Sequence, residues 1–275
     1  MPVKPGQHYA MGGIETDEWG ATCVGGLYAV GECACASVHG ANRLGGNALP
    51  ELAVFGARAG RHAAGGVEEP SKISTGWDTD SEEGENVSPV PLGEADLPSA
   101  NKGALADGGV AASDAANVVD AAVEAEQARV RYLMEKEEGI NHATVRSELQ
   151  ETMTENVNVF REEGALKDAL AEIRQARQDY QHVTVEDPSR TYNTDLIHTI
   201  ETRNLLDVAE AITVGALARD EFRGAHWRKE HQERKDDEWL KHTMLSWNDG
   251  SPGLWYKPAM LEGEEKTYEP KERSY

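Results

Sequence analysis

The second half of the chain alternates between apolar and polar positions with the 3.6-residue period of an α-helix. Four segments keep this period long enough to predict a helix, and each carries an apolar stripe on one face. Ser113 and Asp114 are typical N-cap residues, so we expect the first helix to begin there and to end near Lys136. Stripes of this kind are typical of core packing and predict a three- or four-helix bundle. The predicted helices cover residues 113–136, 143–161, 164–182 and 194–219.

The last three stripes predict which side chains these helices bury. The stripe of the second helix consists of Val145, Leu149, Met153, Val157 and Phe160. That of the third consists of Leu166, Leu170, Ile173 and Tyr180. That of the fourth consists of Leu196, Ile200, Leu205, Val208, Ile212 and Ala216.

The first 64 residues follow a different pattern, rich in glycine and short apolar runs. Residues 26–31 read as a short buried strand that ends in a glycine. Residues 47–63 predict a helix, with Pro50 in its first turn, where a missing N–H is tolerated. One face of this helix carries mostly small side chains, which would let a neighbour approach its backbone closely. That face consists of Leu49, Leu52, Ala53, Gly56, Ala59, Gly60 and Ala63.

Between these halves, the sequence becomes acidic and loses its hydrophobic period. Glycine, proline and serine recur from about residue 65 to 112, so we expect a solvated linker or insertion. At the other end, the last 35 residues scatter aromatic side chains among glycines and prolines, and we expect an extended tail that wraps the bundle. The predicted domain organisation is therefore residues 1–64, an acidic linker over 65–112, and a helical domain with its tail over 113–275.

Charge and cysteine content narrow the function classes. The chain has 49 acidic and 27 basic residues and a net charge of −22, so a nucleic acid is not an expected partner. The acidic surplus fits a protein adapted to high salt. No apolar run reaches the roughly 20 residues of a membrane span, so we expect a soluble protein that reaches a membrane only through a partner. The three cysteines, all between residues 23 and 35, predict reduced and mostly buried thiols and no zinc site.

The candidate chemistry lies between residues 8 and 49. His8 precedes two glycines, and Glu32 follows the predicted strand. Arg43 lies in a glycine-rich loop that opens the small-residue helix; its planar guanidinium matches a carboxylate, and the helix start offers free N–H groups. These features favour an anionic ligand over purely structural glycines. The structural alternatives are that His8 caps its turn and that Glu32 pairs with Arg43. No nucleophile, general base or set of metal ligands is evident.

Several motifs closely resemble the flavoprotein subunit of succinate dehydrogenase and fumarate reductase. In the first block they are His-Tyr-x-Met-Gly-Gly-Ile over 8–14, Gly-Leu-Tyr-Ala-Val-Gly-Glu over 26–32 and Ser-Val-His-Gly-Ala-Asn-Arg-Leu-Gly-Gly-Asn over 37–47. In the helical block they cover residues 148–153, 223–226, 236–242 and 256–258. The resemblance spans about residues 1–64 and 143–275, and motifs of this length are far more specific than a lone G-x-G-x-x-G. It implies an α+β fold: the C-terminal piece of an FAD-binding α/β domain (strand, glycine-rich turn, helix), an α-helical bundle and an extended tail.

The same resemblance implies roles for individual residues. His8 and Arg43 match residues that bind a dicarboxylate substrate, succinate or fumarate, and Glu32 matches a glutamate that bonds the FAD ribose. Ala48 and Leu49 match the pair whose backbone faces the flavin ring, although the family often has serine at the first of these positions. His39 is expected to be structural in the same loop.

The resemblance also implies that part of the enzyme is supplied elsewhere. The G-x-G-x-x-G loop, the histidine that tethers FAD and the proton-transfer arginine have no match here, so we expect a fragment or split subunit that is inactive alone and has no catalytic residue of its own. Expected partners are the N-terminal half of the flavoprotein, an iron–sulfur subunit and membrane anchor subunits, which would pass electrons toward quinone. We expect a peripheral location on the cytoplasmic face of the membrane, and a role in electron transport and the tricarboxylic acid cycle.

Two other interpretations remain open from the sequence. L-Aspartate oxidase shares a similar His-Tyr and Asn-Arg-Leu pattern, but Met11 and the Arg-Leu-Gly-Gly-Asn run over 43–47 favour the dehydrogenase. The other is a non-catalytic helical interaction protein, in which the bundle folds and the flavin-facing residues are unused.

Overall fold

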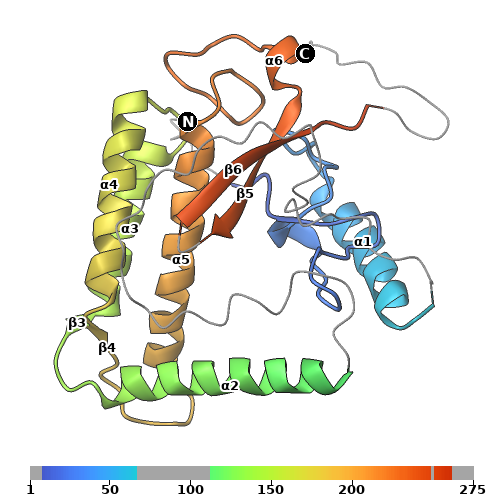
Figure 1. The fold of residues 1–275 in the computed structure, drawn as a ribbon. Helices are drawn as coiled ribbons and strands as arrows, with labels where there is room; N and C mark the ends of the chain where they lie inside the picture. The colour runs from blue at the N-terminus through green and yellow to red at the C-terminus, as the bar shows by residue number, and fades with distance from the viewer. Residues whose placement is uncertain (1–7, 67–111, 249–250, 262–275) are drawn as a thin grey trace. The chain divides into compact units, whose positions relative to one another are not determined.

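A computed structural model describes residues 8–66, 112–248 and 251–261 (Figure 1). The described residues form two compact units. The first consists of residues 8–66 and 222–227, and the second of residues 112–221 and 228–261. The boundary predicted between residues 64 and 113 lies largely outside the described residues, so it stays a prediction.

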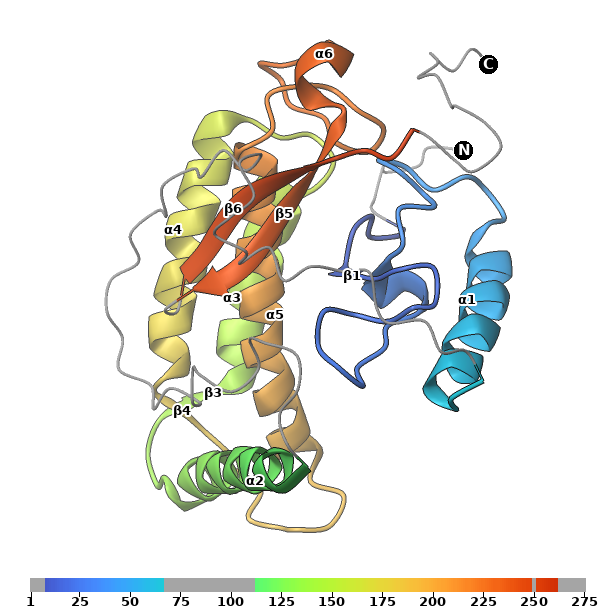
Figure 2. The same cartoon turned by 45° about the vertical axis from the view of Figure 1, so that its right-hand side comes forward.

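The first unit is built from short strands and one helix. Strands β1 (Ile14–Glu15) and β2 (Ala34–Cys35) pair in parallel, with Ile14 opposite Ala34. A single 3₁₀ turn, η1 (Gly31–Cys33), leads into β2. The prediction of mostly buried cysteines is wrong, because Cys23 and Cys33 are exposed and Cys35 is half-buried. Helix α1 (Ala48–Ala63) follows, and Figure 2 shows it running alongside the loops that carry β1.

The strand predicted over residues 26–31 is wrong in detail. In the structure this segment makes one isolated antiparallel bridge, Tyr28 with Ala21. The flanking bonds, from Thr22 N–H to the Leu27 carbonyl and from Ala29 N–H to the Gly20 carbonyl, close a tight loop. Gly31 then turns the chain into η1 with a positive φ of 82°, because glycine adopts this conformation without a Cβ clash. The apolar run is therefore a looped, extended segment with no continuous strand ladder beside it in the described residues.

The predicted helix over 47–63 is confirmed, and its small-residue face is only partly covered. Ala59 of that face is buried, as is Glu51 on another side of the helix. Elsewhere on the small-residue face, Leu49 is 76% exposed and Leu52 is 45% exposed. A stable helix in water normally buries its apolar face, so this surface is available to a further piece of structure.

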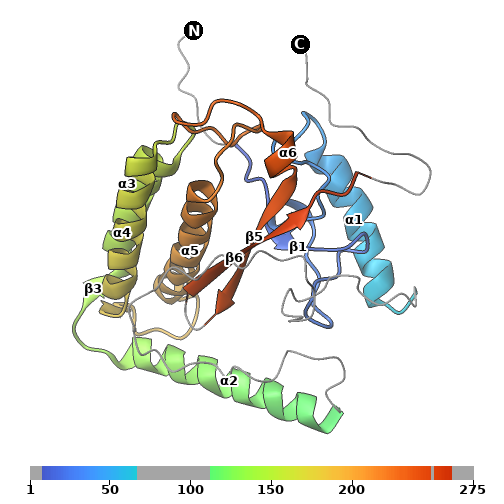
Figure 3. The ribbon, with the colours of Figure 1, turned by 45° about the horizontal axis from the view of Figure 1, so that its top comes forward.

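The second unit is mainly helical. Helices α3 (His142–Thr152), α4 (Glu163–Tyr180) and α5 (Thr194–Leu217) stand side by side, and α2 (Ala112–Glu135) lies across one end of them (Figures 1 and 3). The short strands β3 (Ile140–Asn141) and β4 (Val183–Thr184) pair in parallel at that end. One turn of π-helix, η2 (Met153–Val157), continues α3, and α6 (Asp236–Trp239) follows later in the chain. The four predicted helices are thus present, within a few residues of their predicted ends.

The core of this unit contains most of the predicted stripes. Its main cluster joins buried side chains of α3, α4, β4 and α5: Val145, Leu149, Ile173, Ala176, Val183, Leu206 and Ala209. Phe160 is an exception, at 63% exposed. The helix has already ended with η2 at Val157, so Phe160 no longer lies on the stripe that the period assigned it.

The stripe predicted for α5 is wrong in part. Ala216 is buried as predicted, but Leu205, Val208 and Ile212 are 38%, 55% and 37% exposed, and half of the residues on the buried face are polar. Its three threonines each donate a hydroxyl hydrogen bond of 2.8 Å to the carbonyl one turn earlier, so they are satisfied within the helix. The fully buried Glu210 is paired with Arg174 and Arg177 of α4. The buried face consists of Thr199, Thr202, Leu206, Ala209, Glu210, Thr213, Val214 and Ala216.

The predicted extended tail is a β-hairpin as far as it is described. Strands β5 (Lys241–Asn248) and β6 (Ser251–Pro258) pair antiparallel, and they lie against α5 (Figure 1). Gly215 of α5 leaves room for Leu245 at this contact. Within the described residues, no helix is long and apolar enough to cross a bilayer.

Candidate functional site

The glycine-rich loop over residues 39–43 packs against a turn over residues 223–226, which lies far away in the sequence. The Ala225 N–H donates a 2.8 Å hydrogen bond to the Ala41 carbonyl, and reciprocal backbone bonds of 3.0 Å close a turn from Arg223 to His226. Gly224 in this turn has a φ of 58°. A Cβ added there would lie 2.6 Å from the Ala41 carbonyl, so only glycine fits without a shift. The turn therefore fixes the backbone that presents His39 and Arg43.

Replacing Gly224 by alanine should loosen this loop. The new Cβ must push away the Ala41 backbone and also disfavours the positive φ, together costing about 1–3 kcal/mol. We expect faster hydrogen exchange at the Ala225 amide. Gly25→Ala is the matched control, since a Cβ there meets nothing within 4 Å. Equal Ala225 exchange in both variants would show that the close approach does not hold the loop.

Four side chains of the first unit meet next to this loop. The Glu51 carboxylate, on the first turn of α1, accepts hydrogen bonds from His39 Nε2 at 2.6 Å and from the Tyr9 hydroxyl at 3.3 Å. The Tyr9 and His39 rings meet edge to face, with centroids 5.6 Å apart. The Arg43 guanidinium lies over the Tyr9 ring, with its central carbon 4.8 Å from the centroid. We call Tyr9, His39, Arg43 and Glu51 the His–Arg cluster.

The His–Arg cluster contains two polar atoms that lack a partner among the described residues. Both His39 Nδ1 and Arg43 Nε are shielded from solvent and make no hydrogen bond. A buried donor without a partner costs about 1–3 kcal/mol, so native proteins usually satisfy such groups with water or a ligand. His39 Nδ1 and Arg43 Nε are therefore the atoms that would bind a polar, anionic ligand at this site.

The protonation state of Tyr9 follows from its surroundings. Partial burial raises the pKa of the Tyr9 phenol, and the charge and hydrogen bond of Glu51 act in the same direction. Glu32 raises this pKa further, whereas Arg43 lowers it. The phenol therefore stays protonated near neutral pH and acts as a hydrogen-bond donor to Glu51.

Of the predicted site residues Arg43, His8 and Glu32, the first belongs to the His–Arg cluster and the other two are close to Tyr9 in the sequence or bonded to its neighbour. Arg43 is part of it, and His8 is exposed one residue before Tyr9. The Glu32 carboxylate accepts a 2.9 Å hydrogen bond from the Ala10 N–H, so it holds the segment that carries His8. Of the two structural alternatives, the pairing of Glu32 with Arg43 is not seen: within the described part of the chain, no ion pair joins these two residues, and Glu32 is bonded to Ala10 instead.

Ala48 and Leu49 form the first two positions of α1. The N-cap residue, Asn47, makes no side-chain hydrogen bond to the helix, so its first N–H groups are not capped by it. Ala48 is half-buried and Leu49 is exposed. The helix start thus offers backbone donors and a positive dipole potential close in sequence to Arg43.

Sequence reasoning missed Tyr9 and Glu51. Glu51 lies opposite the small-residue face of its helix, where an acidic side chain normally reaches solvent. A signal was nevertheless available, because a carboxylate in the first turn of a helix that follows a histidine- and arginine-bearing loop has basic groups within reach. Tyr9 belongs to the same motif as His8, and the motif alone assigns it no role.

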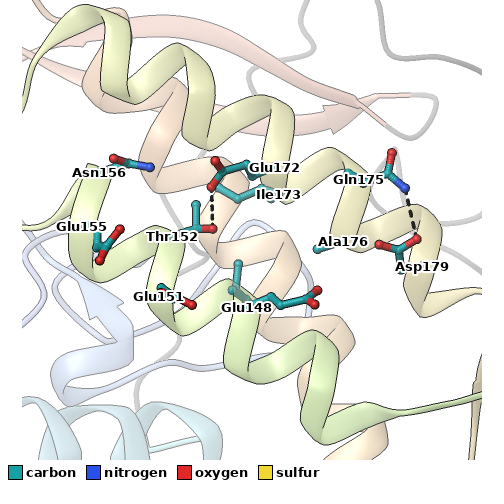
Figure 4. Close-up of a pocket in the computed structure, with 11 residues that line it drawn as sticks. Glu148, Glu151, Thr152, Glu155, Asn156, Glu172, Ile173, Gln175, Ala176 and Asp179 are labelled. Carbon is teal, nitrogen blue, oxygen red and sulfur yellow. Dashed lines mark hydrogen bonds between the residues drawn. The ribbon is translucent and has the colours of Figure 1, made fainter.

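A concavity lies between α3 and α4, away from the His–Arg cluster in the sequence, with a volume of about 370 Å³ (Figure 4). Its walls carry the carboxylates of Glu148, Glu151, Glu155, Glu172 and Asp179. Two of them are bonded to neighbouring side chains, Glu172 to the Thr152 hydroxyl at 2.7 Å and Asp179 to the Gln175 amide at 3.0 Å. Such walls repel an anion. Among the described residues no group of three metal-ligating side chains is placed to hold a metal ion.

Comparison with known proteins identifies relatives of this chain. Residues 146–275 match the model described as fumarate reductase flavoprotein C-term, and residues 1–49 match the model of an FAD binding domain. The fumarate reductase flavoprotein subunit of Haemophilus influenzae is 33% identical over 95% of this chain, and that of Mycobacterium tuberculosis strain H37Rv is 35% identical over 95%. The chain is related to the C-terminal part of the flavoprotein subunits of succinate dehydrogenase and fumarate reductase. These relatives are named as flavoprotein subunits, and the match of residues 1–49 to the FAD binding domain model indicates FAD as the cofactor.

Solved structures agree with this assignment. The flavoprotein FrdA of Escherichia coli quinol fumarate reductase superposes with a TM-score of 0.72 at 34% identity, over 94% of this chain. A quinol–fumarate reductase with menaquinol molecules gives a TM-score of 0.70 at 32% identity, over 93% of the chain. The chain spans 38% of each of these structures, and 37% and 39% of the Haemophilus and Mycobacterium subunits.

The described residues fit the FAD that the family model implies. The uncapped start of α1 offers N–H donors to an electron-rich edge, and Leu49 and Leu52 present an exposed apolar face beside it. Glu32 supplies a carboxylate of the kind that bonds a ribose hydroxyl. These groups would contact the flavin and one ribose, and they would leave the rest of the dinucleotide without contacts.

Proposed function

We propose that this chain supplies the dicarboxylate-binding side chains and the flavin-facing helix of a succinate dehydrogenase/fumarate reductase flavoprotein. The observation that carries the proposal is Arg43: its guanidinium is held over Tyr9, its buried Nε lacks a partner among the described residues, and it lies just before the uncapped start of α1. A planar fork of this kind suits a substrate carboxylate, and the helix start suits the flavin.

Each predicted residue has a role in this proposal. Arg43 clamps one carboxylate of succinate or fumarate, and the exposed His8 binds a carboxyl group from the loop that Glu32 anchors through Ala10. Glu32 bonds the FAD ribose through its carboxylate. Ala48 and Leu49 face the flavin through their backbone. Bound FAD would supply the hydride acceptor for the interconversion of succinate and fumarate.

The interconversion of succinate and fumarate requires groups that the described residues do not provide. The relatives are more than twice as long as this chain, and none of its residues matches the family's proton-transfer arginine or its G-x-G-x-x-G loop. We therefore propose that the active form, the assembled flavoprotein, unites this chain with the segment that corresponds to the rest of the relatives, in one polypeptide or in two.

The proposal extends to electron-transfer partners. A structural relative is titled as a quinol–fumarate reductase with menaquinol molecules. By analogy we propose an iron–sulfur subunit and membrane anchor subunits that connect the assembled flavoprotein to a quinone pool, and a peripheral position on the cytoplasmic face of the membrane.

Substrate-dependent dye reduction tests the proposed function. The assembled flavoprotein should reduce an artificial electron acceptor with succinate and not with L-aspartate. Activity with L-aspartate alone would assign the chain to an L-aspartate oxidase. Activity with neither substrate, in a preparation that holds FAD, would leave a non-catalytic interaction protein as the better interpretation.

A further inference from the structure

Glu51 is the single carboxylate of helix α1, and it is buried. Its side chain is 5% exposed, and the His39 side chain is 12% exposed. A single oxygen of Glu51, Oε2, accepts from both His39 Nε2 and the Tyr9 hydroxyl. Burying a carboxylate is costly unless hydrogen bonds or opposite charges compensate it. These two donors, together with the dipole at the start of α1, provide that compensation.

The contact to Glu51 fixes how the imidazole of His39 is turned. With Nε2 bonded to the carboxylate, Nδ1 lies on the other side of the ring, since the two nitrogens of an imidazole point in different directions. Nδ1 is shielded from solvent and has no partner in the described part of the chain. A carboxylate that orients a histidine through one nitrogen, leaving the other for a ligand, is a common device at binding sites.

The same carboxylate reaches Arg43 through Tyr9. The phenol is tied to Glu51 at 3.3 Å, and its ring carries the Arg43 guanidinium on one face. Tyr9 also meets the His39 ring edge to face, so the three side chains cannot turn independently. Arg43 Nε is the second buried atom without a partner among the described residues.

We infer that Glu51 is a positioning residue, which through His39 and Tyr9 sets the orientation of Arg43, and that His39 Nδ1 is a further contact for the ligand that Arg43 binds. The identity of that ligand as a dicarboxylate rests on the proposed function. The orientation itself rests on the contacts of the His–Arg cluster.

The charges in the cluster are consistent with an anionic ligand. A bare carboxylate at this place would repel a dicarboxylate. Glu51 is not bare, because its Oε2 accepts hydrogen bonds from His39 and Tyr9, and the positively charged Arg43 guanidinium lies over the Tyr9 ring beside it. Glu51 thus acts on the ligand through its donors, and its loss should weaken binding more than it slows the reaction step.

Nuclear magnetic resonance on the full 275-residue chain tests the pairing directly. A short N–H···O⁻ bond gives a downfield imidazole proton, protected from exchange, which His39→Gln should abolish and thereby assign. Glu51→Gln keeps the size of the side chain and removes its charge, so this proton should move upfield. Glu148→Gln, an exposed glutamate on α3, makes the same charge change elsewhere and should leave it in place. A proton that is absent from the wild type, or unmoved in Glu51→Gln, would overturn the positioning role.

Steady-state kinetics on the assembled flavoprotein tests the consequence. Glu51→Gln should raise KM for succinate about tenfold while kcat stays within about threefold, the pattern of lost substrate binding. Glu51→Asp, which keeps the charge, should recover part of this loss, and Glu148→Gln should match the wild type. A lower yield of folded FAD-loaded protein, with the KM of the remainder unchanged, would show a merely structural role. If the wild type itself does not oxidise succinate, the proposed function is wrong, and the magnetic resonance result alone decides the positioning role.

Discussion

Arg43→Lys should lower kcat/KM for succinate in the assembled flavoprotein by about 30- to 1,000-fold. The guanidinium can bond a carboxylate with two parallel N–H groups, and an ammonium cannot reproduce that fork. Its loss removes roughly 2–4 kcal/mol of transition-state stabilisation. The structure adds a second cost, because the planar guanidinium lies over the Tyr9 ring and a lysine would not hold the same orientation.

Ala48→Ser is the matched comparison for this prediction. It introduces a residue that the family often has at this position, at the half-buried start of α1, and it should leave kcat/KM within about threefold. Steady-state succinate oxidation measures both variants. If Arg43→Lys stays within about threefold of the wild type, Arg43 is not the substrate clamp.

The helices could be predicted because their signal is local. The periods over 164–182 and 194–219 predicted α4 and α5 nearly to their ends, since every position that sets a helix lies within a few residues of its neighbours. The period over 143–161 predicted α3 but overran its end, because the chain changes to the π-turn η2 after Thr152. Which face is buried is not local. On α5, Glu210 is buried because Arg174 and Arg177 of another helix reach it, and a hydrophobic period cannot register such partners.

The site shows the same division. Arg43 and the start of α1 were predictable from a contiguous motif, because a loop and the helix that follows it stay together in any fold. Glu51 was not, since its importance depends on Tyr9, 42 residues away. The turn at Gly224 is a longer-range case: its fit against Ala41 joins residues more than 180 positions apart, and only the resemblance marked that segment as significant.

The isolated chain should neither retain FAD nor oxidise succinate. The resemblance implies that FAD is held chiefly by the G-x-G-x-x-G loop and a tethering histidine, and the 275 residues contain no G-x-G-x-x-G. A binding pocket normally buries most of its ligand, whereas Leu49 beside the helix start is 76% exposed. One charged hydrogen bond from Glu32 contributes about 1.5–3 kcal/mol, which does not exceed the cost of immobilising a dinucleotide.

Adding the remaining segment of the flavoprotein should reverse this result. The exposed face of α1, with Leu52 at 45% exposed, would then be covered, and the flavin would be enclosed rather than held at an open surface. Absorbance spectra after gel filtration measure the retained FAD, and dye reduction measures succinate oxidation, for the chain alone and for the assembled flavoprotein. If the isolated chain retains stoichiometric FAD or reduces the dye with succinate, this prediction is wrong. The residues of this chain would then form a complete site, because no other polypeptide would be present to bind FAD.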